Sequence, residues 1–285
     1  MKVVLAGAYG HLGSDILTAL LETGHEIVAL DCMEPREEAG YQYIYHKIDV
    51  TEPATLQGLM EGAQVVISTV GLTKASATVT NEQIDYQGNV NLLKEALRAG
   101  VKHFAYVSVL KADKAPDVPM LSAKYQFEER LKQSGMQYLI VRPTGYFYDI
   151  VKVFRPMIEK GSVSLLGKKP VHANVIATED LAQYIVEHML DQNKSYDIGG
   201  KETYSYEEIA TMCFEAAGKA PQIKRAPVVL FTILAFINKL KKNGKEGLIK
   251  FSKWTLTEEM VGSVQYGERS FKQYIKDNFS KEGNY

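Results

Sequence analysis

The fold is decided by residues 2–13, which read KVVLAGAYGHLG. Residues 3–6 form a short apolar run, which is typical of a strand buried on both faces. Glycines follow at 7, 10 and 13, and Leu12, Ile16 and Leu20 then share one face of a predicted helix. A strand, a glycine turn and a helix in this order present free backbone N–H groups and a positive dipole end to an anion.

The glycines of this turn allow the backbone to approach a pyrophosphate without a Cβ atom in the way. Glycines alone are weak evidence, because any tight turn uses glycine. The interpretation as a dinucleotide site rests on the strand before the turn and the helix after it. The predicted cofactor-binding residues of the turn are Gly7, Tyr9, Gly10, His11, Leu12 and Gly13.

Asp31 follows a second predicted strand over residues 26–30. A carboxylate at that point can accept hydrogen bonds from the adenosine ribose hydroxyls and repels a 2′-phosphate, which favours NAD(H). Arg36 could pair with a 2′-phosphate, so NADP(H) stays open. The alternative is an ordinary aspartate in a surface turn.

The composition is that of an ordinary globular protein, with 285 residues, 46% hydrophobic residues and a net charge of −1. This balance argues against a nucleic-acid binder that works by bulk positive charge. Cys32 and Cys213 are far apart in sequence, so we expect reduced thiols and no metal site. Met1 and Lys2 run straight into the first strand and no apolar stretch reaches about 18 residues, so we expect a cytoplasmic protein.

Strands alternate with helices through the first half of the chain, which predicts an α/β fold with a doubly wound parallel sheet. We assign residues 1–150 to this dinucleotide-binding domain. The predicted strands are 3–6, 26–30, 41–48, 64–68, 103–108 and 137–142, and the connections include helices over 81–99 and 122–134, with a further helix start at Thr51.

Distinctive residues follow the carboxyl ends of these strands, the edge where an open α/β sheet forms its ligand crevice. They are Gly7, Asp31, Asp49, Thr69, Val70, Gly71, Ser108, Arg142, Pro143, Thr144 and Gly145.

Beyond Gly145 the alternation ends, and residues 151–285 are predicted to form a smaller α+β substrate lobe, intertwined with the first domain. Ser205 and Glu208 form a capping box that starts a helix. The other expected elements are helices over 147–159, 178–190 and 270–279 and short strands over 163–166, 171–176 and 195–198.

The segment 228–245 begins with a run, Val228 to Ile237, that is apolar except for Thr232. Four lysines follow this run, at 239, 241, 242 and 245. One interpretation is an interfacial helix that touches a membrane. The interpretation we favour is a helix buried against the lobe, over an apolar pocket or in a dimer contact. We expect a monomer or a homodimer.

Six motifs in residues 1–220 resemble the atypical short-chain dehydrogenases/reductases, in particular their NmrA-like, isoflavone-reductase-like and divinyl-chlorophyllide-reductase-like branches. They are GAYGHLG (7–13), DYQGN (85–89), VKHFAYVS (101–108), LIVRPTGYF (139–147), ATEDLA (177–182) and YDIGG (196–200). The resemblance implies a Rossmann fold that binds NAD(P).

By this resemblance the three glycines would hold the pyrophosphate and Asp31 the adenosine ribose. Asp49 and Val50 would border the adenine. The remaining implied cofactor contacts are Thr69, Val70 and Gly71 beneath the cofactor, Ser108 and Lys124 beside it, and Pro143, Gly145 and Phe147 at its nicotinamide end.

The chain departs from the superfamily at its Tyr-x-x-x-Lys pair, because Met120 stands four residues before Lys124. Val109 also stands where many relatives have a serine, with Ser108 adjacent. A methionine neither donates nor accepts a proton, which argues against the usual tyrosine-driven chemistry and against a sugar-nucleotide epimerase.

Lys124 is the candidate general acid, since it shares a helical stripe with Phe127, Glu128 and Leu131 and would be costly to bury unused. The isoflavone-reductase-like branch has a lysine at the matching place. The alternatives are a lysine that only binds ribose, or one that extends to the surface. Tyr125, Tyr146 and Tyr148 are possible replacement hydroxyl donors.

Two functions follow from these residues. The first is an NAD(P)H-dependent reductase of an apolar, conjugated small molecule whose identity the sequence leaves open. The second is a non-catalytic dinucleotide-binding redox sensor or regulatory or assembly protein of the NmrA-like type.

Overall fold

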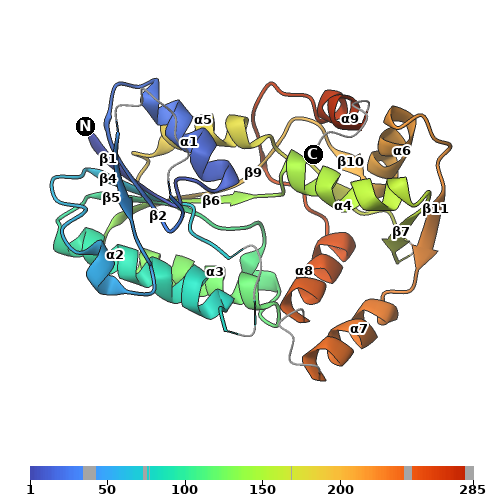
Figure 1. Cartoon of the computed structure of the whole chain (residues 1–285), viewed down its shortest axis with the longest axis horizontal. Helices are drawn as coiled ribbons and strands as arrows, with labels where there is room; N and C mark the ends of the chain where they lie inside the picture. The colour runs from blue at the N-terminus through green and yellow to red at the C-terminus, as the bar shows by residue number, and fades with distance from the viewer. Residues whose placement is uncertain (35–42, 73–75, 77, 168, 241–245, 280–285) are drawn as a thin grey trace. The chain divides into compact units, whose positions relative to one another are not determined.

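In the computed structural model, β1 (Lys2–Ala6) is an inner strand of an eight-stranded parallel sheet (Figure 1). The structure describes residues 1–34, 43–72, 76, 78–167, 169–240 and 246–279. Arg36 and the lysines at 241, 242 and 245 lie outside them. The predicted α/β fold with a parallel sheet is confirmed.

The strand order is β12-β9-β6-β5-β4-β1-β2-β3. The order reverses at β1, because β2 and β3 lie on one side of it and β4 on the other, and in such sheets the reversal marks the ligand crevice. The other strands are β2 (Glu26–Asp31), β3 (Ile44–Lys47), β4 (Val65–Ser68), β5 (His103–Val107), β6 (Gln137–Pro143), β9 (Lys194–Gly199) and β12 (Val264–Gln265).

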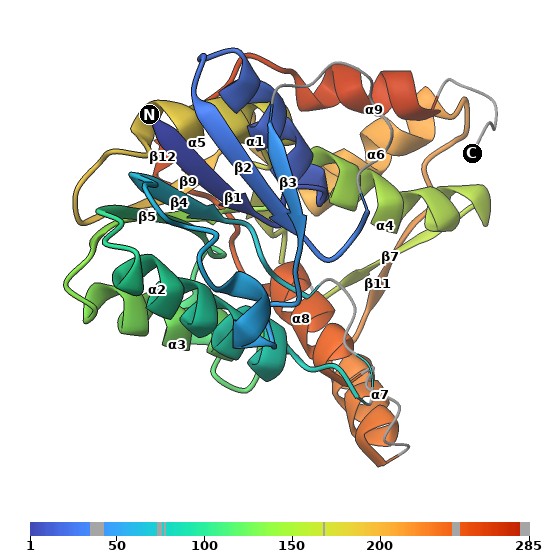
Figure 2. The same cartoon turned by 60° about the vertical axis from the view of Figure 1, so that its left-hand side comes forward.

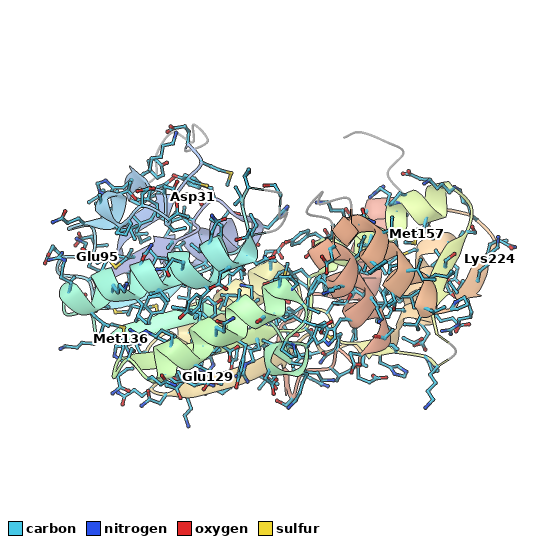
Figure 3. All side chains as sticks on the ribbon, turned by 90° about the horizontal axis from the view of Figure 1, so that it is seen from below. Asp31, Glu95, Glu129, Met136, Met157 and Lys224 are labelled. Atoms are coloured by element: carbon cyan, nitrogen blue, oxygen red, sulfur yellow. The ribbon has the colours of Figure 1, made fainter. Side chains whose placement is uncertain are left out.

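The chain divides into two compact units, the first formed by residues 1–142 and 181–196. Within it α1 (His11–Leu21) covers one face of the sheet, and α2 (Asn89–Arg98) and α3 (Pro119–Lys132) cover the other (Figure 2). Figure 3, seen from below, shows α2 and α3 side by side. Because helices cover both faces, the inner strands carry continuous apolar runs, such as residues 3–6 of β1 and 65–67 of β4, rather than an alternating pattern.

The core of the first unit consists of such strand residues together with the inner faces of the helices. Val4, Val66 and Phe104 are fully or almost fully buried, and Phe127 of α3 packs edge-on against the ring of Tyr106. Each large apolar side chain buried in this way contributes about 1.5–3 kcal/mol to folding.

The helix expected over 81–99 is two helices in succession. Residues Glu82–Gly88 form a π-helix, η2, and α2 begins only at Asn89. The Asn89 side chain donates through Nδ2 to the backbone carbonyl of Asp85, at 2.9 Å. A side chain that enters the backbone hydrogen-bond ladder is a recognised cause of such a distortion, and hydrophobic periodicity does not report it.

Other predicted elements are shorter or join a different sheet. The strand expected over 195–198 is β9, which belongs to the eight-stranded sheet, and the strand over 171–176 is reduced to β8 (His172–Ala173). The helix start at Thr51 gives only a short 3-10 helix, η1 (Pro53–Leu56), after which Gly58 turns the chain with a φ of +81°.

The second unit, residues 143–180 and 197–285, combines two small sheets with helices. β7 (Val163–Leu166) pairs with β11 (Ile223–Ala226), and β8 pairs with β10 (Tyr204–Ser205). The predicted capping box at Ser205 and Glu208 is confirmed. The helices of the second unit are α4 (Phe147–Glu159), α6 (Tyr206–Ala216), α7 (Val229–Leu240), α8 (Glu246–Thr257) and α9 (Phe271–Phe279). The remaining helices of the described chain are α5 (Thr178–His188) and a 3-10 helix, η3 (Ala112–Lys114).

One face of α7 carries large apolar side chains that are exposed to solvent. Burial against the lobe, one of the favoured interpretations of this segment, is wrong for that face, whose side chains are exposed, whereas Ala235 of the same helix is buried. No helix in the described ranges is long and apolar enough to cross a membrane. The exposed residues, which we call the α7 stripe, are Val229, Leu230, Ile233, Phe236 and Ile237.

Candidate functional site

The glycine turn begins where β1 ends. Gly7 has a φ of +82°, a conformation that favours glycine, and its N–H donates to the carbonyl oxygen of Leu30. Gly10 is the N-cap of α1, and the described side chains provide no hydrogen bond to that cap. The first turn of α1 therefore presents its N–H groups and positive dipole end at the turn, as a diphosphate requires.

Strand register brings Asp31 to this turn, because Ala6 pairs with Leu30 in the parallel ladder of β1 and β2. Asp31 is only 5% exposed. Its Oδ2 accepts a hydrogen bond from the Tyr9 N–H (2.8 Å) and its Oδ1 accepts one from the Met33 N–H (3.0 Å). Each carboxylate oxygen can accept a further bond, so Asp31 holds the turn and keeps acceptor capacity for ribose hydroxyls.

Two tyrosines that sequence reasoning missed lie beside the turn. The Tyr9 hydroxyl is 3.1 Å from the Tyr43 hydroxyl, and the Tyr9 ring lies 5.4 Å from the Tyr45 ring. Burial raises the pKa of Tyr9, so its hydroxyl is neutral at physiological pH. The two-residue spacing of Tyr43 and Tyr45 in a predicted strand was the signal available, because it places both on one face.

The loop after β4 contacts the same turn. Ala6 pairs with Ser68 across β1 and β4, so both strands end together. Thr69 Oγ1 then donates to the carbonyl oxygens of Gly7 (3.0 Å) and Ala6 (3.2 Å). This loop and the glycine turn thus form one connected surface at the reversal of the strand order.

Asp49 and Val50 lie after β3 and mainly hold their own turn. Asp49 is exposed, and its Oδ1 accepts from both the N–H and the hydroxyl of Thr51. The Val50 carbonyl accepts from Asn91 Nδ2 at 2.9 Å. Their contact with adenine stays a prediction.

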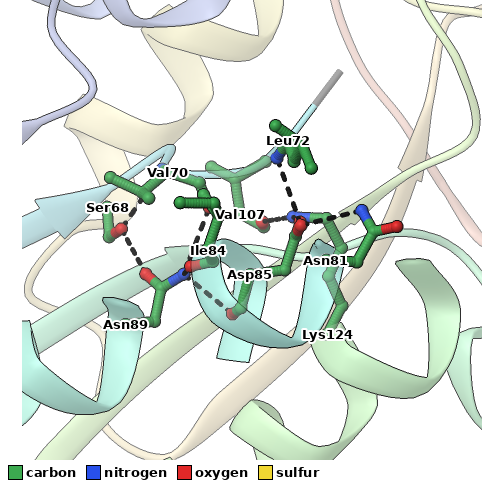
Figure 4. A network of polar contacts seen from close by, with 9 residues as sticks. All are labelled: Ser68, Val70, Leu72, Asn81, Ile84, Asp85, Asn89, Val107 and Lys124. Carbon is green, nitrogen blue, oxygen red and sulfur yellow. Dashed lines mark hydrogen bonds and ion pairs between the residues drawn. The ribbon is translucent and has the colours of Figure 1, made fainter. Parts of the chain in front are cut away.

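Lys124 projects from α3 toward the ends of β4 and β5 (Figure 4). Its side chain is 11% exposed, so a lysine that extends to the surface is excluded. Nζ donates to the Val107 carbonyl at 3.2 Å and lies 3.4 Å from Asp85 Oδ1. It also lies 5.3 Å from the centre of the Tyr106 ring. Met120, at the position of the usual tyrosine, is half-buried in the first turn of α3.

Asp85 and Ser108 complete this part of the site. Ser108 Oγ is buried and has no hydrogen-bond partner among the residues described. Asp85 belongs to the motif 85–89, but sequence reasoning gave it no role. The sequence feature that could have identified Asp85 is the polar series Asn81, Asp85 and Asn89. These residues are spaced by four on a segment expected to be helical, so they share one face.

Pro143, Gly145 and Phe147 belong to the second unit and are described within it. Phe147 begins α4 and packs its ring against Phe271 and Tyr274 of α9. Tyr146 and Tyr148, two alternative hydroxyl donors, stack on each other. The predicted place of this segment at the nicotinamide end stays a prediction.

The site is therefore a glycine turn with a buried carboxylate, a loop joined to that turn, and a nearly buried lysine. The described part of the chain holds no group of three His, Cys, Asp or Glu side chains that could bind a metal ion. The residues present fit a dinucleotide, since the helix N-terminus suits its phosphates and Asp31 suits its ribose.

Comparison with known proteins supports this fit. A family model described as NAD(P)H-binding matches residues 7–192. The Photosystem II assembly factor Ycf39 of Synechocystis sp. is 26% identical over 242 residues, which cover 82% of this chain and 73% of that protein. The divinyl chlorophyllide a 8-vinyl-reductase of Zea mays is 26% identical over 322 residues, which cover 98% of this chain and 77% of that protein.

Among solved structures, the NADPH-dependent quinone oxidoreductase QOR2 of Escherichia coli, complexed with NADPH, superposes with a TM-score of 0.73 at 18% identity. The match covers 97% of this chain and 99% of that one. At this identity the likeness shows the fold.

Proposed function

Because the chain belongs to the NAD(P)H-binding family, we propose that it is an NADH-dependent reductase of an apolar, conjugated small molecule, with Lys124 as the proton donor. One observation carries the proposal. The Lys124 ammonium is almost buried and lies beside Gly71. Gly71 belongs to the loop after β4, in which Thr69 contacts the glycine turn.

The preference for NADH over NADPH rests on Asp31. Its buried carboxylate is attached to the glycine turn through the Tyr9 N–H, so it keeps its place when a ligand arrives. A fixed negative charge at this point accepts ribose hydroxyls and repels a 2′-phosphate.

When bound, the nicotinamide supplies a hydride, which reduces a C=C or C=O bond together with one proton. The residues of this chain would bind and orient the dinucleotide: the glycine turn would hold its phosphate oxygens, and Asp31 would hold its adenosine ribose. Lys124 gives the proton from Nζ to the atom next to the one that takes the hydride, and water then returns a proton to the amine. This step needs no metal ion.

The test compares Lys124→Met and Lys124→Arg with the wild type on a panel of quinones, enones and aldehydes. We expect Lys124→Met to lose at least about 100-fold in kcat, the typical contribution of a general acid. Lys132→Met, on the same helix but in a pair with Glu129, is the matched control and should keep its rate. If Lys124→Met keeps full turnover, Lys124 is not the acid.

A second candidate function is non-catalytic, as a dinucleotide-binding assembly or regulatory protein. The α7 stripe favours it, because a contiguous exposed apolar face is a common mark of an interaction site. Met120 in place of the usual tyrosine and the assembly-factor relative support it as well. Tight NADH binding with no turnover on any compound of the panel would select this function.

A further inference from the structure

We propose that Asp85 is the positioning residue of this site, which fixes the Lys124 ammonium and joins it to the loop 70–72 after β4. The inference deepens the proposed function, on which the role of Lys124 rests. The sequence marks Asp85 only as a member of the polar series Asn81, Asp85 and Asn89; its contacts in Figure 4 distinguish it from the other two.

The two oxygens of Asp85 have different tasks. Its carboxylate is fully buried, and Oδ2 accepts from the Leu72 N–H at 3.1 Å and from Asn81 Nδ2 at 3.0 Å. Oδ1 accepts no hydrogen bond from the described residues and lies 3.4 Å from Lys124 Nζ. Two donors thus orient the carboxylate, and its remaining oxygen faces the ammonium, which offsets the cost of burying the charge.

Gly71 provides the space for this ion pair. A Cβ atom added there would lie 2.9 Å from Asp85 Oδ1 and 3.1 Å from Lys124 Nζ. The φ of Gly71 is not in the left-handed region, so the backbone conformation alone does not require glycine. The pair itself occupies the place where a side chain would go.

Asn89, the first residue of α2, connects Asp85 to β4 a second time. The Asn89 amide donates to the Val70 carbonyl at 3.2 Å as well as to the Asp85 carbonyl, and its oxygen accepts from Ser68 Oγ at 2.6 Å. The backbone and the side chain of Asp85 are therefore both attached to β4 or to the loop that follows it. A ligand that moves this loop would move Lys124 through Asp85.

Asp85 is the carboxylate that balances the charge of Lys124. Two other ionisable residues are close by: the ring of Tyr106 of β5 lies beside the ammonium, and Glu128 lies four residues after Lys124 on α3. Burial raises the pKa of Tyr106 well above its usual range, so this residue is neutral. Glu128 is fully buried, but Arg142 binds its carboxylate through Nε (3.0 Å) and a terminal nitrogen (2.5 Å).

The test is the pH dependence with which an amine-reactive reagent labels Lys124 in the cofactor-free protein, followed by mass spectrometry. Asp85→Asn keeps the shape and removes the charge, and a buried amine without its counter-charge loses its proton more easily. We expect the midpoint of labelling to move down by about one pH unit or more. The alkaline limb of the turnover profile should move in the same direction.

Glu128→Gln is the matched control, because it removes an equally buried carboxylate from the same neighbourhood. We expect a lower melting temperature and an unchanged labelling midpoint. If Asp85→Asn does not fold, Gly71→Ala replaces it, since it separates the pair and leaves both charges in place.

An unchanged midpoint in Asp85→Asn, or an equal shift in Glu128→Gln, would overturn the positioning role. The labelling needs neither cofactor nor substrate. A wild type without turnover would thus count against the proposed reductase while the labelling still decides the role of Asp85.

Discussion

Gly13 lies so close to Gly7 that a Cβ atom on Gly13 would be 1.9 Å from the Gly7 carbonyl oxygen. The contact fixes the angle at which α1 leaves the turn, and it is backbone against backbone, so no side-chain movement could relieve it. The third glycine of the motif is thus required by the fold before any ligand is bound.

Gly13→Ala should therefore lower the free energy of unfolding by more than about 2 kcal/mol, since the strand and the helix must separate. Denaturant titration measures the loss. Gly10→Ala is the control, because its Cβ would lie 3.4 Å from the same oxygen, an ordinary contact. We expect this variant to unfold like the wild type but to bind NADH less tightly; equal stability of the two variants would contradict the account.

Thr69→Val removes the hydroxyl that joins the β4 loop to the glycine turn while nearly preserving the side-chain shape. We expect a loss of about 1 kcal/mol in stability, the net value of a neutral hydrogen bond, and weaker NADH binding. Thr18→Val is the control, because the Thr18 hydroxyl donates to the Ser14 carbonyl oxygen in the preceding turn of α1 itself. If both variants bind NADH like the wild type, the loop does not support the cofactor turn.

Cys32 follows Asp31 directly and is exposed, so its thiol can be alkylated in the free protein. A dinucleotide bound at Asp31 would cover this thiol, and bound NADH should therefore slow the alkylation. Partial desolvation and the Asp31 charge raise the pKa of Cys32, and the reaction should therefore accelerate as the pH rises above 9. Cys213 is the internal control, since burial raises the pKa of its thiol to about 12. It should react only on unfolding, with or without NADH; alkylation of Cys32 unaffected by NADH would place the cofactor elsewhere.

The sequence was sufficient for the parallel sheet and for the resemblance to the atypical short-chain dehydrogenases/reductases, both of which are confirmed. Buried parallel strands such as β1 and β4 are continuous apolar runs, and a strand followed by glycines and a helix has few other structures to adopt. The strand ends could be predicted because a parallel ladder aligns them, which brought Asp31 and Thr69 to the glycine turn.

The rest depends on contacts between distant residues. The π-helix at Glu82–Gly88 coincides with a hydrogen bond from the Asn89 side chain to the Asp85 carbonyl, and the ion pair of Asp85 and Lys124 joins residues far apart in sequence. Hydrophobic periodicity gives only the face on which Lys124 lies, and says nothing of its partner. The exposure of the α7 stripe could not be predicted either, since the sequence of an apolar helix has the same pattern whether its apolar face is buried or exposed to solvent.

The most direct test is a calorimetric titration of the protein with NADH and with NADPH, repeated on Asp31→Asn. We expect the wild type to bind NADH at least about tenfold more tightly than NADPH, a difference of about 1.4 kcal/mol in binding free energy, and Asp31→Asn to narrow this difference. Glu34→Gln, which removes the same charge from an exposed carboxylate, should leave the preference unchanged. Tighter binding of NADPH would contradict the role of Asp31, and binding of neither would contradict the dinucleotide site itself.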